Sequence, residues 1–188
     1  MFRNSFGASF KFVEKLGRTA SDIEVAVTPE TKEILGVSCV VVRERVWEKG
    51  KLAQETLSWH AQDKRANVWL FGEESKEFLD RGRVNTEGSW EAGVDGAEAG
   101  IVMKGDPSPG EPYRHGYRAG VAEDMAQVVA VSDSVTVPFG SFTGCVNAKE
   151  WSMLESGTDK RWYARGIGLV RGESAAKEVT MLVSVSRP

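Results

Sequence analysis

Cysteine and histidine are scarce in this sequence, with two of each among 188 residues. Two cysteines cannot build a disulfide framework, and no Cys-x-x-Cys or His-Glu-x-x-His pattern occurs, so we expect no bound metal. Phosphate-binding glycine loops, the dinucleotide-binding glycine pattern and the Gly-x-Ser-x-Gly nucleophile elbow are absent too. The sequence therefore gives no reason to expect a cofactor, and no motif assigns a reaction.

Long apolar runs and an excess of positive charge are also missing. No run approaches the roughly 18 apolar residues of a membrane-spanning helix. The formal net charge is −3, whereas domains that bind phosphate backbones usually carry a large positive excess. We therefore expect neither a membrane-spanning segment nor a nucleic-acid partner. The N-terminus lacks the apolar stretch of a signal peptide, although a mature domain written without its leader would look the same.

The pattern that is present is the two-residue alternation of β-strands, rich in Val, Trp, Phe, Tyr and Thr between turn residues. It predicts an all-β, mostly antiparallel domain over residues 1–188, with short helical turns only near residues 29–33, 73–79 and 123–127. The predicted strands cover residues 9–15, 22–28, 37–48, 52–63, 67–72, 83–90, 113–122, 126–132, 135–138, 142–153, 160–165, 168–172 and 178–186.

The longest predicted strand, residues 37–48, would extend roughly 40 Å at about 3.4 Å per residue. A flat sheet of such strands would expose long edges, so the natural closure is a barrel or a strongly curved half-barrel. The sequence does not indicate the oligomeric state.

Two stretches of the chain resemble one another and predict two similar β-meander units, at about residues 22–90 and 113–186. Cys39 and Cys145 each precede a glutamate, Glu44 and Glu150, by five residues. A chance likeness between two β-meanders is the alternative. The cysteines then either pair in a disulfide or remain two buried thiols.

The string from Trp59 to Glu73 resembles an uncharacterised bacterial family that carries Trp-Tyr-Ala-Gln-Asp-x-x-Gly-Asn-Val-Trp-Tyr-Phe-Gly-Glu. The likeness spans about residues 30–172 and implies a periplasmic or secreted protein, but no activity. A looser likeness links the chain to curved antiparallel sheets of the lipoprotein-carrier kind. Ala66 replaces the family's turn glycine, so Asn67 or another residue must adopt a positive φ. Further matching segments are residues 87–97, 122–126, 135–142 and 163–170.

The acidic loop at residues 89–98 contains the first candidate site. Trp90 beside Glu91 and Asp95 suits a sugar, with the ring stacking and the two carboxyl groups acting as acid and base. The same acids suit Ca²⁺, and a solvated Asp-Gly turn is the simpler alternative. His60 and His115 are the candidate general bases, each with a partly exposed cross-strand role as its alternative.

Aromatic side chains are the candidate walls of a pocket. Such rings bind an apolar molecule or a sugar when they line a cavity, and otherwise fill the core of a barrel. The candidates are Trp59, Trp69, Phe71, Trp90, Tyr113 and Tyr163.

The leading functional expectation is an extracytoplasmic barrel that binds a small apolar or amphipathic molecule without catalysis. The alternative is a hydrolase or lyase acting on a carbohydrate or ester through Glu91 and Asp95 with His60 or His115. A purely structural or protein-binding module is the third reading.

Overall fold

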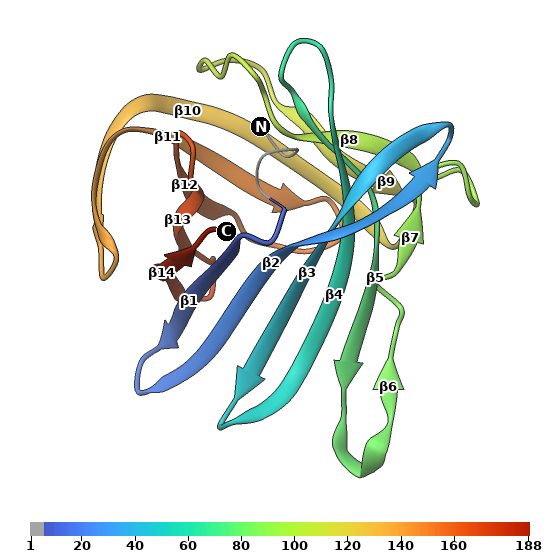
Figure 1. Cartoon of the computed structure of the whole chain (residues 1–188), viewed down its shortest axis with the longest axis horizontal. Coiled ribbons are helices and arrows are strands. Elements are labelled where there is room, and N and C mark those ends of the chain that lie inside the picture. Colours follow the sequence, from blue (N-terminus) through green and yellow to red (C-terminus); the bar gives the residue numbers. More distant parts are fainter. Residues whose placement is uncertain (1–5) are drawn as a thin grey trace.

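The chain forms a closed antiparallel β-barrel (Figure 1). The computed structural model describes residues 6–188. The expectation about a signal peptide concerns the N-terminus and falls partly on residues outside this range. The strands are β1 (Ser9–Leu16), β2 (Thr19–Ile34), β3 (Val37–Glu48), β4 (Lys51–Gln62), β5 (Val68–Phe78), β6 (Val84–Asn85), β7 (Trp90–Glu91), β8 (Glu98–Met103), β9 (Tyr113–Arg118), β10 (Ala122–Val137), β11 (Gly140–Ser152), β12 (Asp159–Ala164), β13 (Gly168–Glu173) and β14 (Val179–Ser186).

Twelve strands make up the wall of the barrel. Their order is β4-β3-β2-β1-β14-β13-β12-β11-β10-β9-β8-β5, and the pairing of β5 with β4 closes the ring. The two short strands β6 and β7 also pair with β5. The first and last strands pair with each other, so both ends of the chain contribute to the wall. The predicted all-β antiparallel barrel is therefore confirmed.

The prediction of three helical turns was wrong: all three segments lie wholly or mostly in strands. Residues 29–33 belong to β2, residues 73–79 mostly to β5 and residues 123–127 to β10. A helix of five to seven residues is marginal by itself, whereas pairing with a long neighbouring strand gives the backbone its hydrogen bonds. Within residues 6–188 the only helical element is the 3₁₀ turn η2 (Asp80–Gly82).

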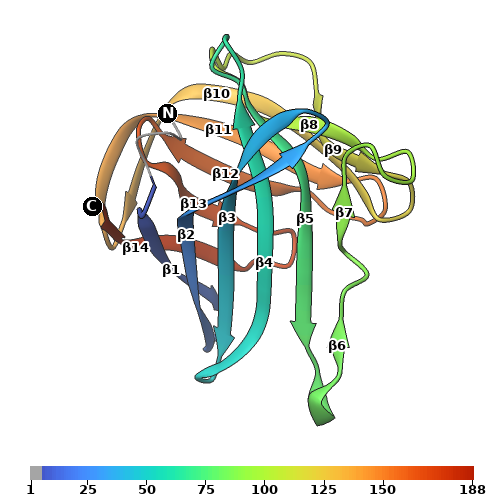
Figure 2. The same ribbon diagram turned by 45° about the vertical axis from the view of Figure 1, so that its right-hand side comes forward.

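Two long hairpins bend away from the barrel wall. The β2–β3 hairpin loses register between Val27 and Thr31, and the β10–β11 hairpin loses it at several places between Val128 and Val135. In Figures 1 and 2 the tip of the β2–β3 hairpin crosses the outside of β4 and β5. The strands β2 and β10 that begin these hairpins both have 16 residues, but β12 and β13 are only half as long as β4 and β5.

The folded-over β2–β3 tip buries an apolar cluster, which we name the hairpin cluster. It consists of Ile34, Cys39, Val41, Trp59, Trp90, Ala92, Ala97 and Ala122. Cys145 is buried in a separate cluster with Phe12, Val135, Val137, Ala164, Val170 and Leu182. Both cysteines are free thiols, so the disulfide alternative is not realised. Burial raises the pKa of Cys39 to about 11, which leaves little reactive thiolate near neutral pH.

Candidate functional site

The side chains that face the barrel interior change character along each strand. Residues directly opposed on neighbouring strands point to the same face. On β1 the inward positions run from Phe10 and Phe12 to Glu14, whose carboxylate accepts a hydrogen bond from Thr180 of β14. On β3 they run from the buried Val42 to Glu44. The interior is therefore apolar towards one end and polar towards the end that holds the β1–β2 and β3–β4 turns.

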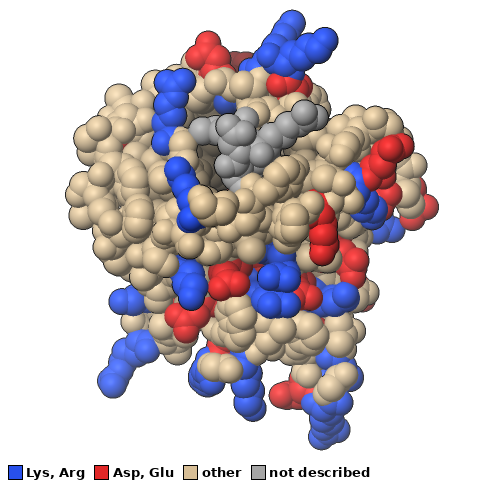
Figure 3. Space-filling view, in the orientation of Figure 1, with Lys and Arg blue, Asp and Glu red and all other residues tan. Residues whose placement is uncertain are grey.

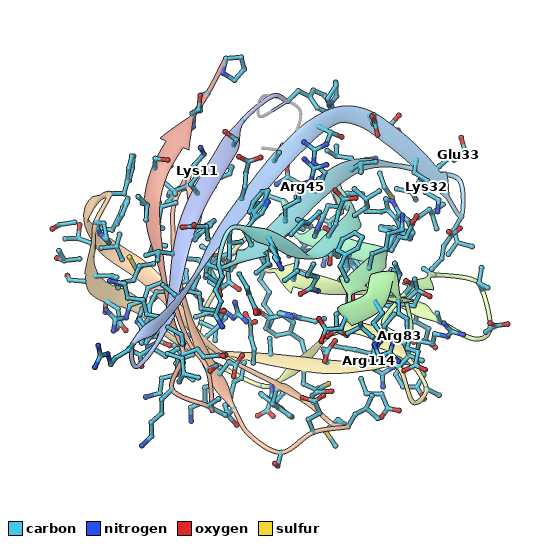
Figure 4. The ribbon with its side chains drawn as sticks, turned by 90° about the horizontal axis from the view of Figure 1, so that it is seen from below. Lys11, Lys32, Glu33, Arg45, Arg83 and Arg114 are labelled. Atoms are coloured by element: carbon cyan, nitrogen blue, oxygen red, sulfur yellow. The ribbon has the colours of Figure 1, made fainter. Side chains whose placement is uncertain are left out.

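The polar half of the interior is not filled by side chains. Glu44 lies in the middle of the wall, between two paired strands, and interacts with Arg161 on the far side of the ring, yet its side chain is exposed. Arg161 itself remains 33% exposed. Barrels of eight strands are just wide enough to be filled or to hold one small ligand, so twelve strands leave more room. Figure 4 looks into the ring from this end.

A groove of about 370 Å³ lies at the polar end, next to the β5–β6 hairpin. Gln54 and Ser75 line it and continue into the interior, where Gln54 donates hydrogen bonds to Thr56 and Ser75. Phe78 and Asn85 of the β5–β6 hairpin line it too. The groove therefore offers a route between the interior and the surface.

Arg161 of β12 is the centre of one polar network. Its guanidinium lies 3.3 Å from Glu150 and 3.4 Å from Asp159. The hydroxyl of Tyr163 donates a hydrogen bond of 2.6 Å to the same Glu150. Burial and the charge of Glu150 raise the pKa of Tyr163 far above its usual value, so the phenol stays protonated. The positive charge of Arg161 is therefore already balanced by its neighbours.

Three further carboxyl groups face the interior without such balance. The surrounding barrel wall partly removes Glu44 from bulk water and so raises its pKa, although its side chain keeps accessible surface inside the barrel and Arg161 opposes the change. Burial, followed by the charges of Asp124 and Glu44, raises the pKa of Glu73 to about 7. Burial also raises the pKa of Asp124, which sits opposite Ser152 in the sheet. These carboxyl groups lie on β3, β5 and β10, so they surround the interior rather than meeting at one point.

Both histidines reach the interior and are held neutral. Burial lowers the pKa of His60 to about 4, and its Nε2 lies 3.0 Å from Ser58 Oγ. Burial also lowers the pKa of His115. Nε2 of His115 and the hydroxyl of Tyr113 are both buried without a hydrogen-bond partner in residues 6–188, and their rings lie 5.9 Å apart. Two polar atoms of β9 are therefore left for a ligand or for water.

Glu91 and Asp95 lie apart from this interior group. Glu91 on β7 forms an ion pair of 2.5 Å with Lys32 of the hairpin tip. Asp95 lies 3.2 Å from Arg118, and its side chain is 70% exposed. Asp95 and Gly96 both have positive φ, as expected of an Asp-Gly turn. The structure gives both acids cationic neighbours on the surface and does not bring them together with His60 or His115.

The six aromatic candidates divide into two groups. Trp59 and Trp90 are buried in the hairpin cluster, and Phe71 packs against it. The indole of Trp69 donates a hydrogen bond of 3.0 Å to Asp63 in the β4–β5 turn. Only Tyr113 and Tyr163 interact with the interior carboxylate Glu150.

Sequence reasoning missed the interior acids and Arg161. Glu44 stands between Arg43 and Arg45, so local composition does not distinguish the inward charge from its outward neighbours. The one available signal was the apolar run that precedes it, because Val40, Val41 and Val42 are all buried and so indicate that both faces of β3 are covered. Nothing in the sequence around Glu73 indicated a role for this residue.

Comparison with models of protein families, with curated proteins and with solved structures found no match. In the part of the chain that the structure describes, no three histidine, cysteine or carboxylate side chains lie close enough together to hold a metal ion. Among the same residues no helix is long and apolar enough to cross a membrane.

Proposed function

We propose that this protein binds a small polar molecule with a positive charge, such as an organic amine, in the acidic half of its barrel. The hollow interior supplies the space, and the carboxyl groups around it supply the recognition. The ligand enters beside the β5–β6 hairpin, where the groove of about 370 Å³ reaches the surface.

The imbalance of charge inside the barrel carries this proposal. Glu73 faces the negative charges of both Glu44 and Asp124, and the guanidinium of Arg161 is occupied by Glu150 and Asp159. Carboxylates that are partly removed from water without a cationic partner are costly, and the cost falls when they hold a proton or gain a cation. A bound ammonium or guanidinium group would replace those protons.

The unpartnered atoms of β9 supply a second, independent argument. Tyr113 has a hydroxyl that is free to donate, and His115 presents Nε2 with no partner in the described chain. Buried polar atoms are normally hydrogen-bonded. A ligand with a hydroxyl or amino group would satisfy both atoms while its charge meets the carboxylates.

This ligand class differs from the apolar molecule that the sequence favoured. That expectation drew on the aromatic content as a cavity lining, whereas Trp59 and Trp90 are buried in the hairpin cluster and Trp69 of β5 is hydrogen-bonded to Asp63. An extracytoplasmic location remains part of the proposal, and the resemblance of residues 59–73 to a bacterial family supports it.

Isothermal titration calorimetry with three probes tests the proposal: agmatine as the cation, glucose as a neutral polar molecule and decanoate as an amphipathic anion. We expect agmatine alone to bind, and its affinity to rise between pH 6 and pH 8 as Glu73 loses its proton. Glu73→Gln and Asp124→Asn should each weaken binding at least tenfold.

Glu74→Gln is the matched control, because Glu74 is the next residue and pairs with Lys76 outside the interior. It should bind agmatine like the parent protein. Binding of decanoate but not agmatine, or equal losses in Glu73→Gln and Glu74→Gln, would overturn the proposal.

Acid–base catalysis is the second candidate, and the place of Glu73 in the interior, next to the charges of Glu44 and Asp124, favours it. A carboxyl group with a pKa of about 7 exchanges protons efficiently at neutral pH. In a hydrolase or lyase, Glu73 would then be the general acid or base, in place of Glu91 or Asp95. Turnover of nitrophenyl esters or glycosides that disappears in Glu73→Gln supports this candidate, and turnover unchanged by that substitution removes it.

A further inference from the structure

Three hairpin turns stand side by side at the polar end of the barrel. They join β1 to β2 at residues 15–19, β3 to β4 at residues 48–51, and β5 to β6 at residues 79–83. The six strands are neighbours in the sheet, and Figures 1 and 2 both show the three turns projecting from the same end. We name these turns together the lower edge.

The lower edge is basic although the whole chain is acidic. Its two acidic residues are Glu48 and Asp80, whereas the net charge of the protein is −3. All of its cationic side chains are exposed, and none forms an ion pair with any described residue. Lys and Arg side chains project from this end in Figure 3, and Figure 4 labels Arg83. The cationic residues are Lys15, Arg18, Lys49, Lys51, Arg81 and Arg83.

Apolar side chains accompany these charges at the tips. Leu16 is 45% exposed in the first turn, and Val84 is 49% exposed beside the third. Phe78 and Leu79 are more than one-third exposed on the same hairpin as Val84. Such side chains have no structural reason to face water, because each belongs to a turn or a strand end that the barrel does not cover.

We propose that the lower edge docks on an anionic lipid surface. Exposed lysine and arginine side chains are attracted to acidic headgroups, and apolar tips enter the boundary between headgroups and acyl chains. A row of separate turns, all of them basic and the first and third also carrying exposed apolar residues, suits a flat and deformable surface. The apolar tips and the overall negative charge disfavour a nucleic acid, which would need a broad positive surface.

This orientation would direct the mouth of the barrel towards the membrane. The polar interior opens at the same end as the three turns, since Glu14 and Glu44 lie closer to them than Phe12 and Val42 do. The docking proposal does not depend on the ligand, because it rests only on residues outside the interior.

Co-sedimentation with vesicles tests the proposal. Vesicles of phosphatidylcholine with 30% phosphatidylglycerol should bind the protein at least tenfold more tightly than vesicles of phosphatidylcholine alone, and 0.5 M NaCl should release it. Lys49→Glu combined with Arg81→Glu should reduce that binding at least tenfold. The control, Lys149→Glu with Arg165→Glu, makes the same change of charge on exposed residues away from the lower edge and should bind normally.

Insertion of the apolar tips has its own measurement. An environment-sensitive fluorophore on Val84→Cys should shift to the blue with anionic vesicles, whereas one on Thr143→Cys, which is exposed at the far hairpin, should not. Cys39 and Cys145 are buried, so they compete little for the label. Equal binding to both vesicle types, equal losses in the two charge variants, or binding to an oligonucleotide but not to vesicles would overturn the proposal.

Discussion

Nζ of Lys32 lies 2.5 Å from Oε2 of Glu91 and 3.5 Å from the centre of the Trp59 ring. This one ammonium group joins the tip of the β2–β3 hairpin to β7 and to the buried tryptophan of β4. It therefore holds the hairpin against the outside of the barrel, above the hairpin cluster.

Lys32→Met should lower the free energy of unfolding by about 1 kcal/mol in urea titrations. Methionine keeps the apolar stem but loses the charge. The ion pair is about one-third exposed and contributes little by itself, so most of the loss comes from the contact with the ring, which is worth about 0.5–1 kcal/mol. Lys76→Met is the control, since its pair with Glu74 is more exposed. A similar loss in both variants would contradict the assigned contact.

Ala66→Gly should stabilise the protein by about 1 kcal/mol. Ala66 itself adopts the positive φ of the β4–β5 turn, at 65°. A residue with a Cβ is strained in this region by roughly 1–2 kcal/mol, and the larger freedom of unfolded glycine offsets part of the gain. Thermal unfolding measures the change. Ala176→Gly, at an exposed turn position with negative φ, should not stabilise.

The ionisation of Glu73 should make the folded protein less stable as the pH rises from about 4.5 to about 7. Its pKa is raised on folding to about 7, so the folded state binds more protons than the unfolded state in this window, and stability falls with pH. One unit of pKa corresponds to about 1.4 kcal/mol. Glu73→Gln removes this loss and should therefore be more stable than the parent protein by roughly 2–3 kcal/mol at pH 8 in urea titrations.

The control for Glu73 is its neighbour Glu74, which faces away from the interior. Glu74→Gln should leave the dependence of stability on pH as it is in the parent protein. If the free energy of unfolding of Glu73→Gln depends on pH as it does in the parent protein, the Glu73 carboxyl group is solvated like any surface acid and the prediction is wrong.

The two histidines should both remain neutral at pH 6.5. The pKa of His60 is lowered to about 4 and that of His115 is lowered too, in each case chiefly by burial. Because the chain has only two histidines, the imidazole signals in a proton–carbon NMR titration are simple to follow. The His60 signal should shift near pH 4. A midpoint between pH 6 and 7 would show that the His60 ring is exposed to water, and would contradict its burial. Between pH 6.5 and 4 this group makes folding less favourable as the pH falls, which opposes the contribution of Glu73.

The local features of this fold followed from the sequence. Strand alternation predicted most of the strands, and Asp95-Gly96 was recognised as a turn. Both of its residues adopt positive φ, as do both residues of Lys49-Gly50 and Arg81-Gly82 in two other turns. Such features depend on residues that are adjacent along the chain. The helical turns failed for the same reason, because residues 29–33 obtain their strand conformation from a partner strand.

The site depended on closure of the sheet. Alternation separates the two faces of a strand, but it does not say which face is inside, and folded-over hairpins bury apolar residues on the outer face as well. Glu91 and Glu44 are the same residue type on strands, yet one meets a surface lysine and the other faces the barrel interior. The sequence by itself determined strands and turns, because those need only neighbours; the ring of twelve strands decided which carboxylates share an interior, because only closure brings β3, β5, β10 and β12 around one space.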